Sequence, residues 1–385
     1  MTTTVNNEHK NIKVPNLRFK EFQREWEKTK FGDIAIVVGG GTPDTKTSQY
    51  WNGRIQWFTP SEIGRNKYVY NSVRTISEEG LNKSNAKLLP IGTILLSSRA
   101  TVGECSINKK ECTTNQGFQS LIPKENISNE FIYYLIQTKR KDLIRKSCGS
   151  TFLEISANEV RKIVVSIPTI KEQDKIAKLL SLLDERIATQ NKIIEDLKKL
   201  KSAISKKLLC NDKWTTYKIQ DIAEIGRGRV ISSVEIDRQK HPLYPVYSSQ
   251  TSNNGIMGYL DNYMFDGEYI TWTTDGANAG TVFYRKGKFN CTNVCGTLKI
   301  LPKFDCYFVS LVLQQATQKY VSSNLANPKL MNNTMASIKI RMPNIETQKQ
   351  LSKVFQTLDS CLLVHQRTCK MYLSEKQYLL RQMFI

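Results

Sequence analysis

The hydrophobic positions along the chain predict two long amphipathic helices that repeat each other. Apolar residues recur at spacings of three and four from Ile176 to Leu208, which corresponds to roughly 50 Å of α-helix. A shift of 175 residues carries this run onto a second one, from Leu351 to Met383. The polar interruptions coincide as well, because Gln190 falls on His365. A repeat in which both the apolar positions and their polar interruptions recur indicates an internal duplication.

The two helices are expected to pair along this apolar seam as an antiparallel coiled coil. Pro168 and Pro343 precede them, and alternating spacings of three and four suit coiled-coil packing. The seam includes Ile176, Leu180, Leu183, Ile187 and Gln190 in the first helix, and Leu351, Phe355, Leu358, Leu362 and His365 in the second. One alternative stays open, in which each helix lies only on its own globular domain. Gln190 and His365 could form a polar layer that fixes register, or be unrelated solvated side chains.

The duplication divides the chain into four segments, which are 11–168, 169–210, 211–343 and 344–385. The first and third are globular in composition, with short β-branched or aromatic runs such as Ile94–Leu96 and Tyr269–Trp272. Asn129–Ile144 and Asp305–Tyr320 have helical patterns at corresponding places. The sequence therefore predicts an α+β protein with two similar domains separated by two long antiparallel coiled-coil helices.

The net charge of the chain indicates what kind of molecule it binds. The 385 residues carry a formal net charge of +21 and a pI near 9.5, which favours a polyanion. No apolar run approaches the roughly 20 residues that span a bilayer, so we expect a cytoplasmic protein that binds nucleic acid rather than a membrane. Cys361, His365 and Cys369 share one helical face and could hold a metal, but seam positions favour packing, and we expect no metal site.

Known catalytic motifs are missing from the sequence. No two of the eleven prolines are adjacent, which excludes the Pro-Pro-aromatic motif of base-amino methyltransferases. No G-x-x-x-x-G-K-[ST] loop for nucleotide phosphates occurs. Pro43-Asp44 is the sole Pro-Asp pair, and no E-x-K of a metal-dependent nuclease follows it. The sequence thus predicts a binding protein without its own active site.

Candidate DNA-binding side chains are cations, amides and aromatics interleaved with turn residues. Lys and Arg would hold phosphates, while Arg, Asn and Gln could form bidentate contacts to base edges. For each one, a role as an ordinary solvated side chain also stays open. The candidates are Lys46, Tyr50, Trp51, Arg65, Lys67, Arg99, Asn115, Gln116, Lys141, Arg145, Arg227, Arg229, Arg238, Lys240, Gln250, Asn253, Thr274, Asn278 and Asn293.

Several of these segments resemble one known family, the specificity subunits of type I restriction–modification systems. Val14–Phe19 with Trp26 is similar to the start of such subunits. Gly40–Pro43, Leu88–Arg99 and Thr114–Gly117 are similar to parts of their first target-recognition domain. Pro168–Gln173 and Pro343–Gln348 look like the beginnings of the family's two long helices. In the second domain Thr292-Asn293 aligns with Thr114-Asn115, so that Val294-Cys295 replaces Gln116-Gly117.

The resemblance implies a non-catalytic subunit in which each target-recognition domain reads one half of a bipartite, asymmetric DNA site. The helices would set the spacing and dock two modification subunits, which would bind S-adenosylmethionine and transfer methyl groups. Restriction subunits would add ATP- and Mg²⁺-dependent translocation and cleavage, leaving no cofactor on this chain. The competing hypothesis is a self-sufficient DNA methyltransferase or nuclease with an unrecognised active site.

Overall fold

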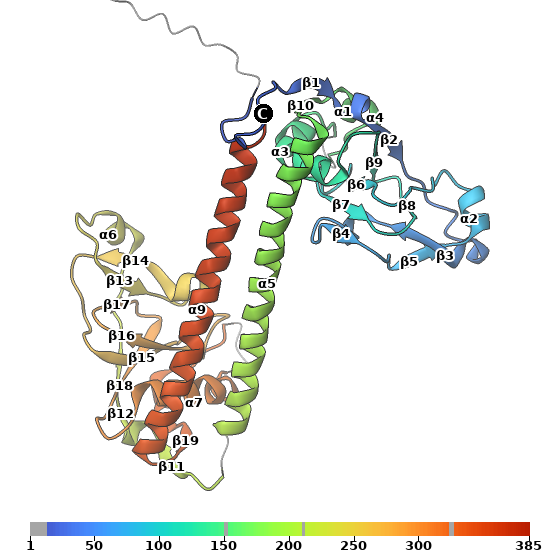
Figure 1. The fold of residues 1–385 in the computed structure, drawn as a ribbon. Helices are drawn as coiled ribbons and strands as arrows, with labels where there is room; N and C mark the ends of the chain where they lie inside the picture. Colours follow the sequence, from blue (N-terminus) through green and yellow to red (C-terminus); the bar gives the residue numbers. More distant parts are fainter. Residues whose placement is uncertain (1–13, 150–152, 210–211, 323–326) are drawn as a thin grey trace, which may run out of the picture. The chain divides into compact units, whose positions relative to one another are not determined.

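The computed structural model describes residues 14–149, 153–209, 212–322 and 327–385 (Figure 1). The chain divides into two compact units. The first unit comprises Met1–Gln190 with Thr368–Ile385, and the second comprises Asn191–Arg367. Each long helix therefore contributes one part to each unit.

Three sheets form the first unit. The largest has the strand order β2 (Ala35–Gly39), β9 (Gln119–Pro123), β6 (Ile94–Leu96), β7 (Cys105–Asn108), β4 (Tyr68–Val69). A second sheet has the order β5 (Arg74–Ile76), β3 (Trp51–Phe58), β8 (Cys112–Thr114), and β1 (Glu27–Lys30) pairs with β10 (Val164–Ile167). The helices are α1 (Phe31–Ile34), α2 (Glu78–Asn82), α3 (Asn129–Arg145) and α4 (Ala157–Lys162), with short 3-10 helices at Ser48–Tyr50 and Pro60–Glu62.

The second unit repeats this plan. Its main sheet has the order β12 (Ala223–Arg227), β18 (Cys295–Ile300), β15 (Glu268–Thr273), β16 (Val282–Lys286). A three-stranded sheet has the order β14 (Ile256–Leu260), β13 (Tyr244–Tyr247), β17 (Asn290–Cys291), and β11 (Thr215–Lys218) pairs with β19 (Lys339–Met342). The helices are α6 (Ser233–Asp237), α7 (Cys306–Ala316) and α8 (Asn332–Ser337), with 3-10 helices at Ile219–Asp221, Ser252–Gly255 and Thr317–Tyr320.

The strand directions match as well as the strand order. In the three-stranded sheets, β3 pairs parallel with β8 and antiparallel with β5, just as β13 pairs parallel with β17 and antiparallel with β14. Among the described residues, strand β4 of the first unit has no counterpart in the second unit's main sheet. Two α+β domains with one topology, as the sequence predicted, are confirmed.

The long helices are α5 (Ile170–Leu208) and α9 (Ile345–Gln382), and they run antiparallel within each unit. In the first unit the Asp184 carboxylate lies 2.7 Å from the Lys376 ammonium. In the second unit Lys201 pairs with Asp359, the residue that corresponds to Asp184 after the 175-residue shift. These cross-helix ion pairs exclude the alternative in which each helix packs only on its own domain.

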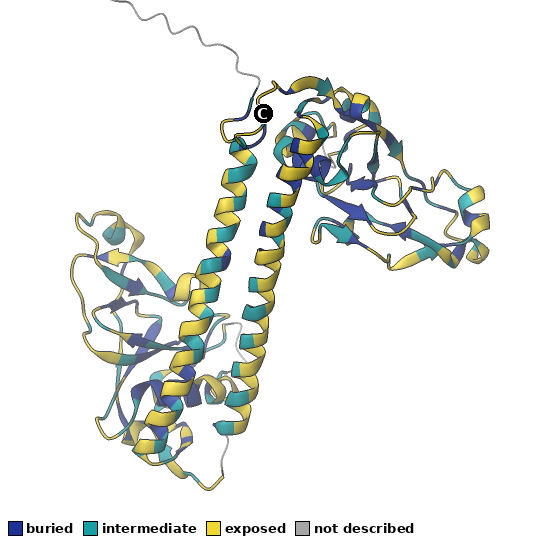
Figure 2. Ribbon diagram, viewed as in Figure 1, coloured by how far each residue is buried: buried dark blue, intermediate teal, exposed yellow. Residues whose placement is uncertain are grey.

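Buried and half-buried positions recur along both helices, among more numerous exposed ones (Figure 2), and they include the predicted seam. Its buried members are Ile176, Leu180, Leu183, Ile187 and Phe355, and its half-buried members are Gln190, Leu351, Leu358, Leu362 and His365. The roles suggested for Gln190 and His365 in fixing register stay a hypothesis.

Each hydrophobic core is closed by the far end of a long helix. Met383 and Phe384, just beyond α9, belong to the core of the first unit, where the Phe384 ring stacks on Phe131 at 5.2 Å. Leu209, just beyond α5, belongs to the core of the second unit. Each compact unit of the fold therefore contains residues from both sequence repeats.

Helix α3 of the first unit and helix α7 of the second unit each contribute a tyrosine that contacts the coiled coil. The Tyr134 hydroxyl donates to Asp184 at 2.8 Å, and the Tyr307 hydroxyl donates to Asp359 at 2.6 Å. Each acceptor is the aspartate of a cross-helix ion pair, so the same carboxylate contacts both the other long helix and the helix of the domain.

We predict that Tyr134→Phe and Tyr307→Phe each lower the free energy of unfolding by about 1–2 kcal/mol, because each removes a hydrogen bond to a charged acceptor. Thermal and denaturant unfolding would measure this, with the exposed Tyr70→Phe as the control that leaves stability unchanged. If one of the two variants behaved like Tyr70→Phe, the two contacts would not be equivalent.

Candidate nucleic-acid interface

Three loops meet at one end of the sheets in the first unit. They follow β2, β6 and β8, and main-chain hydrogen bonds join them. Gly41 N–H donates to Thr114 O at 2.9 Å, and Ser98 N–H donates to Gly117 O at 2.8 Å. Asn115 N–H donates to Phe58 O at 3.0 Å, which ties the third loop to β3. The loops thus form one connected surface.

The second unit builds its loops with the same main-chain bonds. Arg229 N–H donates to Cys291 O at 3.2 Å, and Thr274 N–H donates to Val294 O at 2.9 Å. Thr292 N–H donates to Tyr247 O at 2.8 Å, which repeats the tie to the neighbouring strand. The backbone frame is therefore shared, while the side chains mounted on it differ.

These bonds correct the sequence alignment of the two domains. Thr292, rather than Asn293, makes the bond that Asn115 makes in the first unit, and Val294 takes the place of Gly117. The predicted replacement of Gln116-Gly117 by Val294-Cys295 is therefore wrong by one residue. The two Thr-Asn pairs are identical in sequence, but the main-chain hydrogen bonds to β3 and β13 decide which positions are structurally equivalent.

A glycine at matching places allows the first and third loops to approach closely. A Cβ atom at Gly40 would overlap the carbonyl oxygens of Thr114 and Asn115, and one at Gly228 would overlap those of Cys291 and Thr292. These two glycines therefore permit a backbone approach between the loops that a side chain would block.

Two predicted DNA-binding arginines of the second unit are engaged within the protein. Arg227 donates to Thr274 Oγ1 at 3.0 Å and to the Asp275 carboxylate at 3.2 Å, and also to the carbonyl oxygen of Asn293. Arg229 forms two hydrogen bonds to the Glu235 carboxylate, which raise the pKa of the guanidinium. Both side chains hold loops together in this structure.

In the first unit the position equivalent to Asp275 has the opposite charge. Arg99 pairs with Glu154 at 2.7 Å, whereas Asp275 lies 3.8 Å from Lys329 in the second unit. Both pairs join the loop after β6 or β15 to the strand-like segment that follows α3 or α7. The two units thus present opposite charges at matched places on one backbone frame.

Lys67 lies in a polar network between β4 and the long helix, away from solvent. Its ammonium group donates to Glu130 at 2.9 Å and to Ser181 at 3.1 Å, and its side chain is 9% exposed. Burial raises the pKa of the Glu130 carboxyl, but hydrogen bonds from Tyr68 and Lys67 outweigh it and hold the pKa below its usual range.

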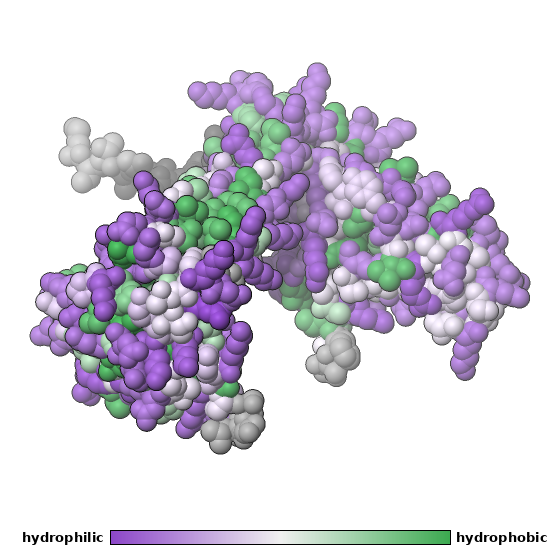
Figure 3. All heavy atoms as spheres, turned by 90° about the horizontal axis from the view of Figure 1, so that it is seen from below, coloured by the Kyte–Doolittle hydropathy of each residue, from purple (hydrophilic) through white to green (hydrophobic). Residues whose placement is uncertain are grey.

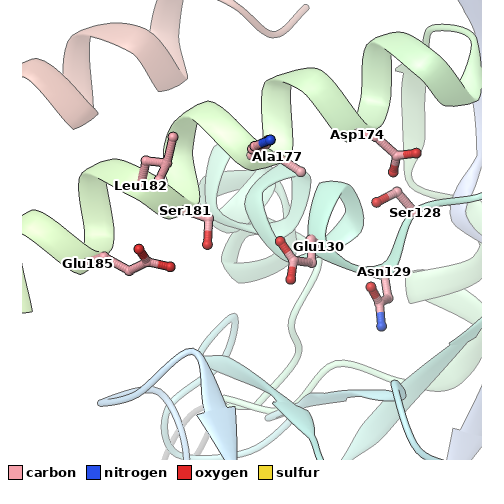
Figure 4. A pocket seen from close by; sticks show the side chains of 9 residues that line it. Ser128, Asn129, Glu130, Asp174, Ala177, Ser181, Leu182 and Glu185 are labelled. Atoms are coloured by element: carbon pink, nitrogen blue, oxygen red, sulfur yellow. The ribbon is translucent and has the colours of Figure 1, made fainter.

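A shallow pocket lies beside this network, where the beginning of α3 meets α5 (Figure 4). Ser181 and Glu185 project from α5 on the side of Glu130, while Leu182 points away. The lining also includes Asp174 and the cation Lys178, so its carboxylates outnumber its ammonium group and the pocket does not suit a DNA phosphate.

Two other predicted contact residues are buried, and the expectation that they present surface side chains is wrong. Trp51 is 8% exposed and packs edge-on against Trp57 at 5.1 Å, with the Arg74 guanidinium 3.5 Å from its ring centroid. Thr274 is fully buried. The pattern of interleaved cations and aromatics did not predict the burial of Trp51. This burial depends on the pairing of its strand, β3, with β5, which the local sequence does not reveal.

Five predicted cations are exposed and, within the described residues, have no carboxylate at ion-pair distance, namely Lys46, Arg65, Lys141, Arg238 and Lys240. Arg145 pairs with Asp142 inside α3. Lys141 and Arg145 lie on this helix rather than on the three loops. On the face shown in Figure 3, hydrophilic residues cover most of the surface of each unit, and smaller apolar patches lie among these residues.

The remaining predicted residues shape the loops or project from them. Asn115 Oδ1 accepts from Gly117 N–H at 2.9 Å, and Gln116 accepts from the Thr42 hydroxyl. Asn278 donates to Ser249 O at 3.2 Å, and Gln250 donates to Ile256 O. Tyr50 packs beside the Trp51 cluster, whereas Asn253 and Asn293 are exposed.

Sequence reasoning missed Arg285, a buried arginine on β16. The available signal was a charged residue directly after the run Val282–Tyr284, on a predicted strand. Among the described residues no group of three or more His, Cys, Asp or Glu side chains is placed to hold a metal ion. None of the described helices combines the length and the apolar composition needed to cross a bilayer.

The sequence matches the family described as "Type I restriction modification DNA specificity domain" over residues 23–199 and 211–370. It is 40% identical over 181 residues to the type I restriction enzyme MjaIX specificity subunit of Methanocaldococcus jannaschii, covering 46% of this chain but only 42% of that protein. It is 38% identical over 196 residues to the putative type I specificity subunit S.MpnORF201P of Mycoplasma pneumoniae, covering 50% of this chain and 82% of that protein.

The fold is similar to that of a solved S subunit of a type I restriction–modification system from M. genitalium. The TM-score is 0.69 at 17% identity, and the match covers 97% of this chain and 99% of that one. A structure concerned with complex assembly of the type I R-M system matches with a TM-score of 0.57 at 13% identity, covering 92% and 96%. At these identities the similarity concerns the fold alone.

We predict different effects for two candidates that lie close together in the sequence. Lys46→Ala should weaken DNA binding about equally on all sequences and reduce the salt dependence by roughly one counterion, because it removes one exposed cation. Trp51→Ala should instead lower the free energy of unfolding by about 3–5 kcal/mol, because it empties a packed site. Salt-dependent binding and thermal unfolding measure the two effects, and a Trp51→Ala protein of unchanged stability would contradict the structural role.

Proposed function

The chain belongs to the type I restriction–modification DNA specificity family, and from this membership we propose that it supplies DNA sequence recognition, without catalysis, to a multi-subunit enzyme. The observation that carries the proposal is the shared loop frame. The same main-chain hydrogen bonds build the loops of both units, and different side chains occupy them. Such an arrangement suits two readers of related design and different sequence preference.

Each unit is proposed to read one half of a bipartite site. Matched positions differ in size and charge, with Gly41 against Arg229 and Arg99 against Asp275. A palindromic site would require equal surfaces on the two halves, so the differences support an asymmetric site. The target sequence itself depends on base contacts that these residues do not define.

Attraction to DNA would come from the excess of basic residues. The formal net charge of +21 supports phosphate contacts, which contribute affinity independent of sequence. Exposed cations with no carboxylate partner in the described part of the chain, such as Lys46, Arg65 and Lys240, are better suited to phosphates than Arg99 or Arg229. The proposed site of action is cytoplasmic DNA.

The long helices are proposed to set the spacing of the half-sites and to dock two modification subunits. Both helices expose large apolar side chains, among them Leu182, Leu200, Val354, Val364 and Met371. Apolar residues on the outer side of a helix pair support contact with another protein.

Catalysis is proposed to reside on the partner chains. Modification subunits would bind S-adenosylmethionine and transfer the methyl group, and restriction subunits would use ATP and Mg²⁺. The competing hypothesis of a self-sufficient methyltransferase or nuclease finds no support in the family match or in the relatives.

We predict that replacing residues 14–166 with the matching domain of another family member changes one half of the methylated motif and leaves the other intact. The reason is that the loops of the first unit lie within this segment, whereas those of the second do not. The swapped chain would be expressed with its modification subunits, and methylated positions would be sequenced genome-wide. A change in both halves would contradict independent reading, and the unswapped chain gives the reference motif.

We predict that removing one heptad from each helix, Asn191–Leu197 and Gln366–Tyr372, alters the spacer between the half-sites or abolishes activity. Seven helical residues correspond to roughly 10 Å, a substantial part of a DNA turn of about 34 Å. Because the two deletions are matched by the repeat, the seam keeps its phase. Sequencing of the methylated motif measures the spacer, and an unchanged spacer would refute the role of the helices in spacing.

A further inference from the structure

A short loop of the second unit, Ser248–Gly255, connects β13 to β14 in an unusual conformation. Asn253, Asn254 and Gly255 have positive φ angles of 49°, 53° and 81°. Non-glycine residues adopt this left-handed region at an energetic penalty, so the loop needs contacts that hold it there. The tip, Thr251–Asn254, is exposed.

Arg285 supplies such a contact from beneath the loop. It lies on β16, is 6% exposed, and donates through Nη2 to the Asn254 carbonyl oxygen at 2.9 Å. Its Nε donates to Thr271 Oγ1 at 3.2 Å, which anchors the guanidinium to β15. One side chain thus links the sheet to the strained part of the loop.

The guanidinium is also stacked on an aromatic ring at the base of the loop. Its central carbon lies 3.5 Å from the ring centroid of Tyr247 and 4.4 Å from that of Phe283. Burial lowers the pKa of Arg285, and within the described residues no carboxylate lies at ion-pair distance from it. An apolar side chain would fill this position without the cost of desolvating a charge. What an arginine adds here is its hydrogen bonds and its stacking on the ring.

Other bonds close the loop around this anchor. Ser248 N–H donates to Gly255 O at 2.9 Å, and Asn278 holds the carbonyl oxygen of Ser249. A Cβ atom at Gly255 would lie 3.1 Å from Gln250 O and 3.2 Å from Arg285 Nη2. The loop is therefore a closed structure with Arg285 against its inner side.

The first unit has a different residue at the corresponding place. Strand pairing sets Ile107 opposite Ile94 and Tyr284 opposite Ile270, so the next residues, Asn108 and Arg285, are equivalent. Asn108 donates to the carbonyl oxygens of Pro90 and Lys110 and holds no loop after β3. Within the described residues, the second unit has this arginine anchor, and the first unit has Asn108 in its place.

We infer that Arg285 is a positioning residue that fixes the Ser248–Gly255 loop in the shape that reads the second half-site. This inference rests on the proposed function. The exposed amides of Asn253 and Asn254 are the side chains that the anchored loop presents, and amides of this kind contact base edges. Arg285 itself is buried and touches no DNA.

The test uses the full chain assembled with its modification subunits and the DNA motif found by methylome sequencing. The discrimination of each half-site is the ratio of the dissociation constants for DNA altered in that half and for intact DNA. Arg285→Met should lower the discrimination of the second half at least tenfold and change that of the first less than twofold. Arg285→Lys keeps the charge but not the planar stacking, and should restore the discrimination only in part.

Two further variants separate positioning from folding. Lys286→Met, on the same strand but exposed and outside the anchor, should leave both ratios unchanged. Gly255→Ala strains the loop at a positive φ and crowds the Arg285 contact while keeping the arginine, and should reproduce the selective loss at the second half-site. Melting temperatures would be measured for every variant.

A folded Arg285→Met chain with unchanged discrimination of the second half-site would overturn the inference, as would equal losses at both halves. If Arg285→Met does not fold, the Gly255→Ala ratio decides, and an unchanged ratio overturns the inference. A wild-type complex without a two-part methylated motif would contradict the proposed function instead, before any variant is compared.

Discussion

The antiparallel contact between the long helices is the constraint on which both cores depend. The first core is incomplete without Phe384, which follows α9, and the second is incomplete without Leu209, which follows α5. Each globular part is thus covered by a helix end from the other repeat. Loss of helix pairing would expose apolar surface in both units, so the coiled coil is a folding requirement and not only a connector.

Charged contacts give this pairing its register. Asp184 accepts a hydrogen bond from Tyr134 and pairs with Lys376, and Asp359 does the same with Tyr307 and Lys201. An apolar seam alone tolerates slippage by a heptad, whereas these carboxylates have their partners in one register only. The tyrosines extend the same constraint to α3 and α7, which pack on the sheets that support the loops.

The sequence was sufficient to predict the duplication, the long helices and the α+β class, because these depend on periodicity that repeats over many residues. It was not sufficient for the loops. Trp51 lies among cations and turn residues, as a DNA-contacting aromatic would. It is nevertheless buried, because it packs against Trp57 and Arg74. The one-residue error at Thr292 has the same origin, because strand pairing between distant segments fixes loop equivalence and leaves no local pattern.

Many basic residues in the loops serve shape rather than charge. Arg227, Arg229 and Arg99 are held by carboxylates, and Arg285 is held by a carbonyl oxygen and a ring. A guanidinium suits this task because it combines several donors with a flat face. In the proposed function, net charge and sequence reading would therefore depend on different residues. The exposed lysines and arginines would attract any DNA, while the internally bound arginines would shape the loops that meet a particular base sequence.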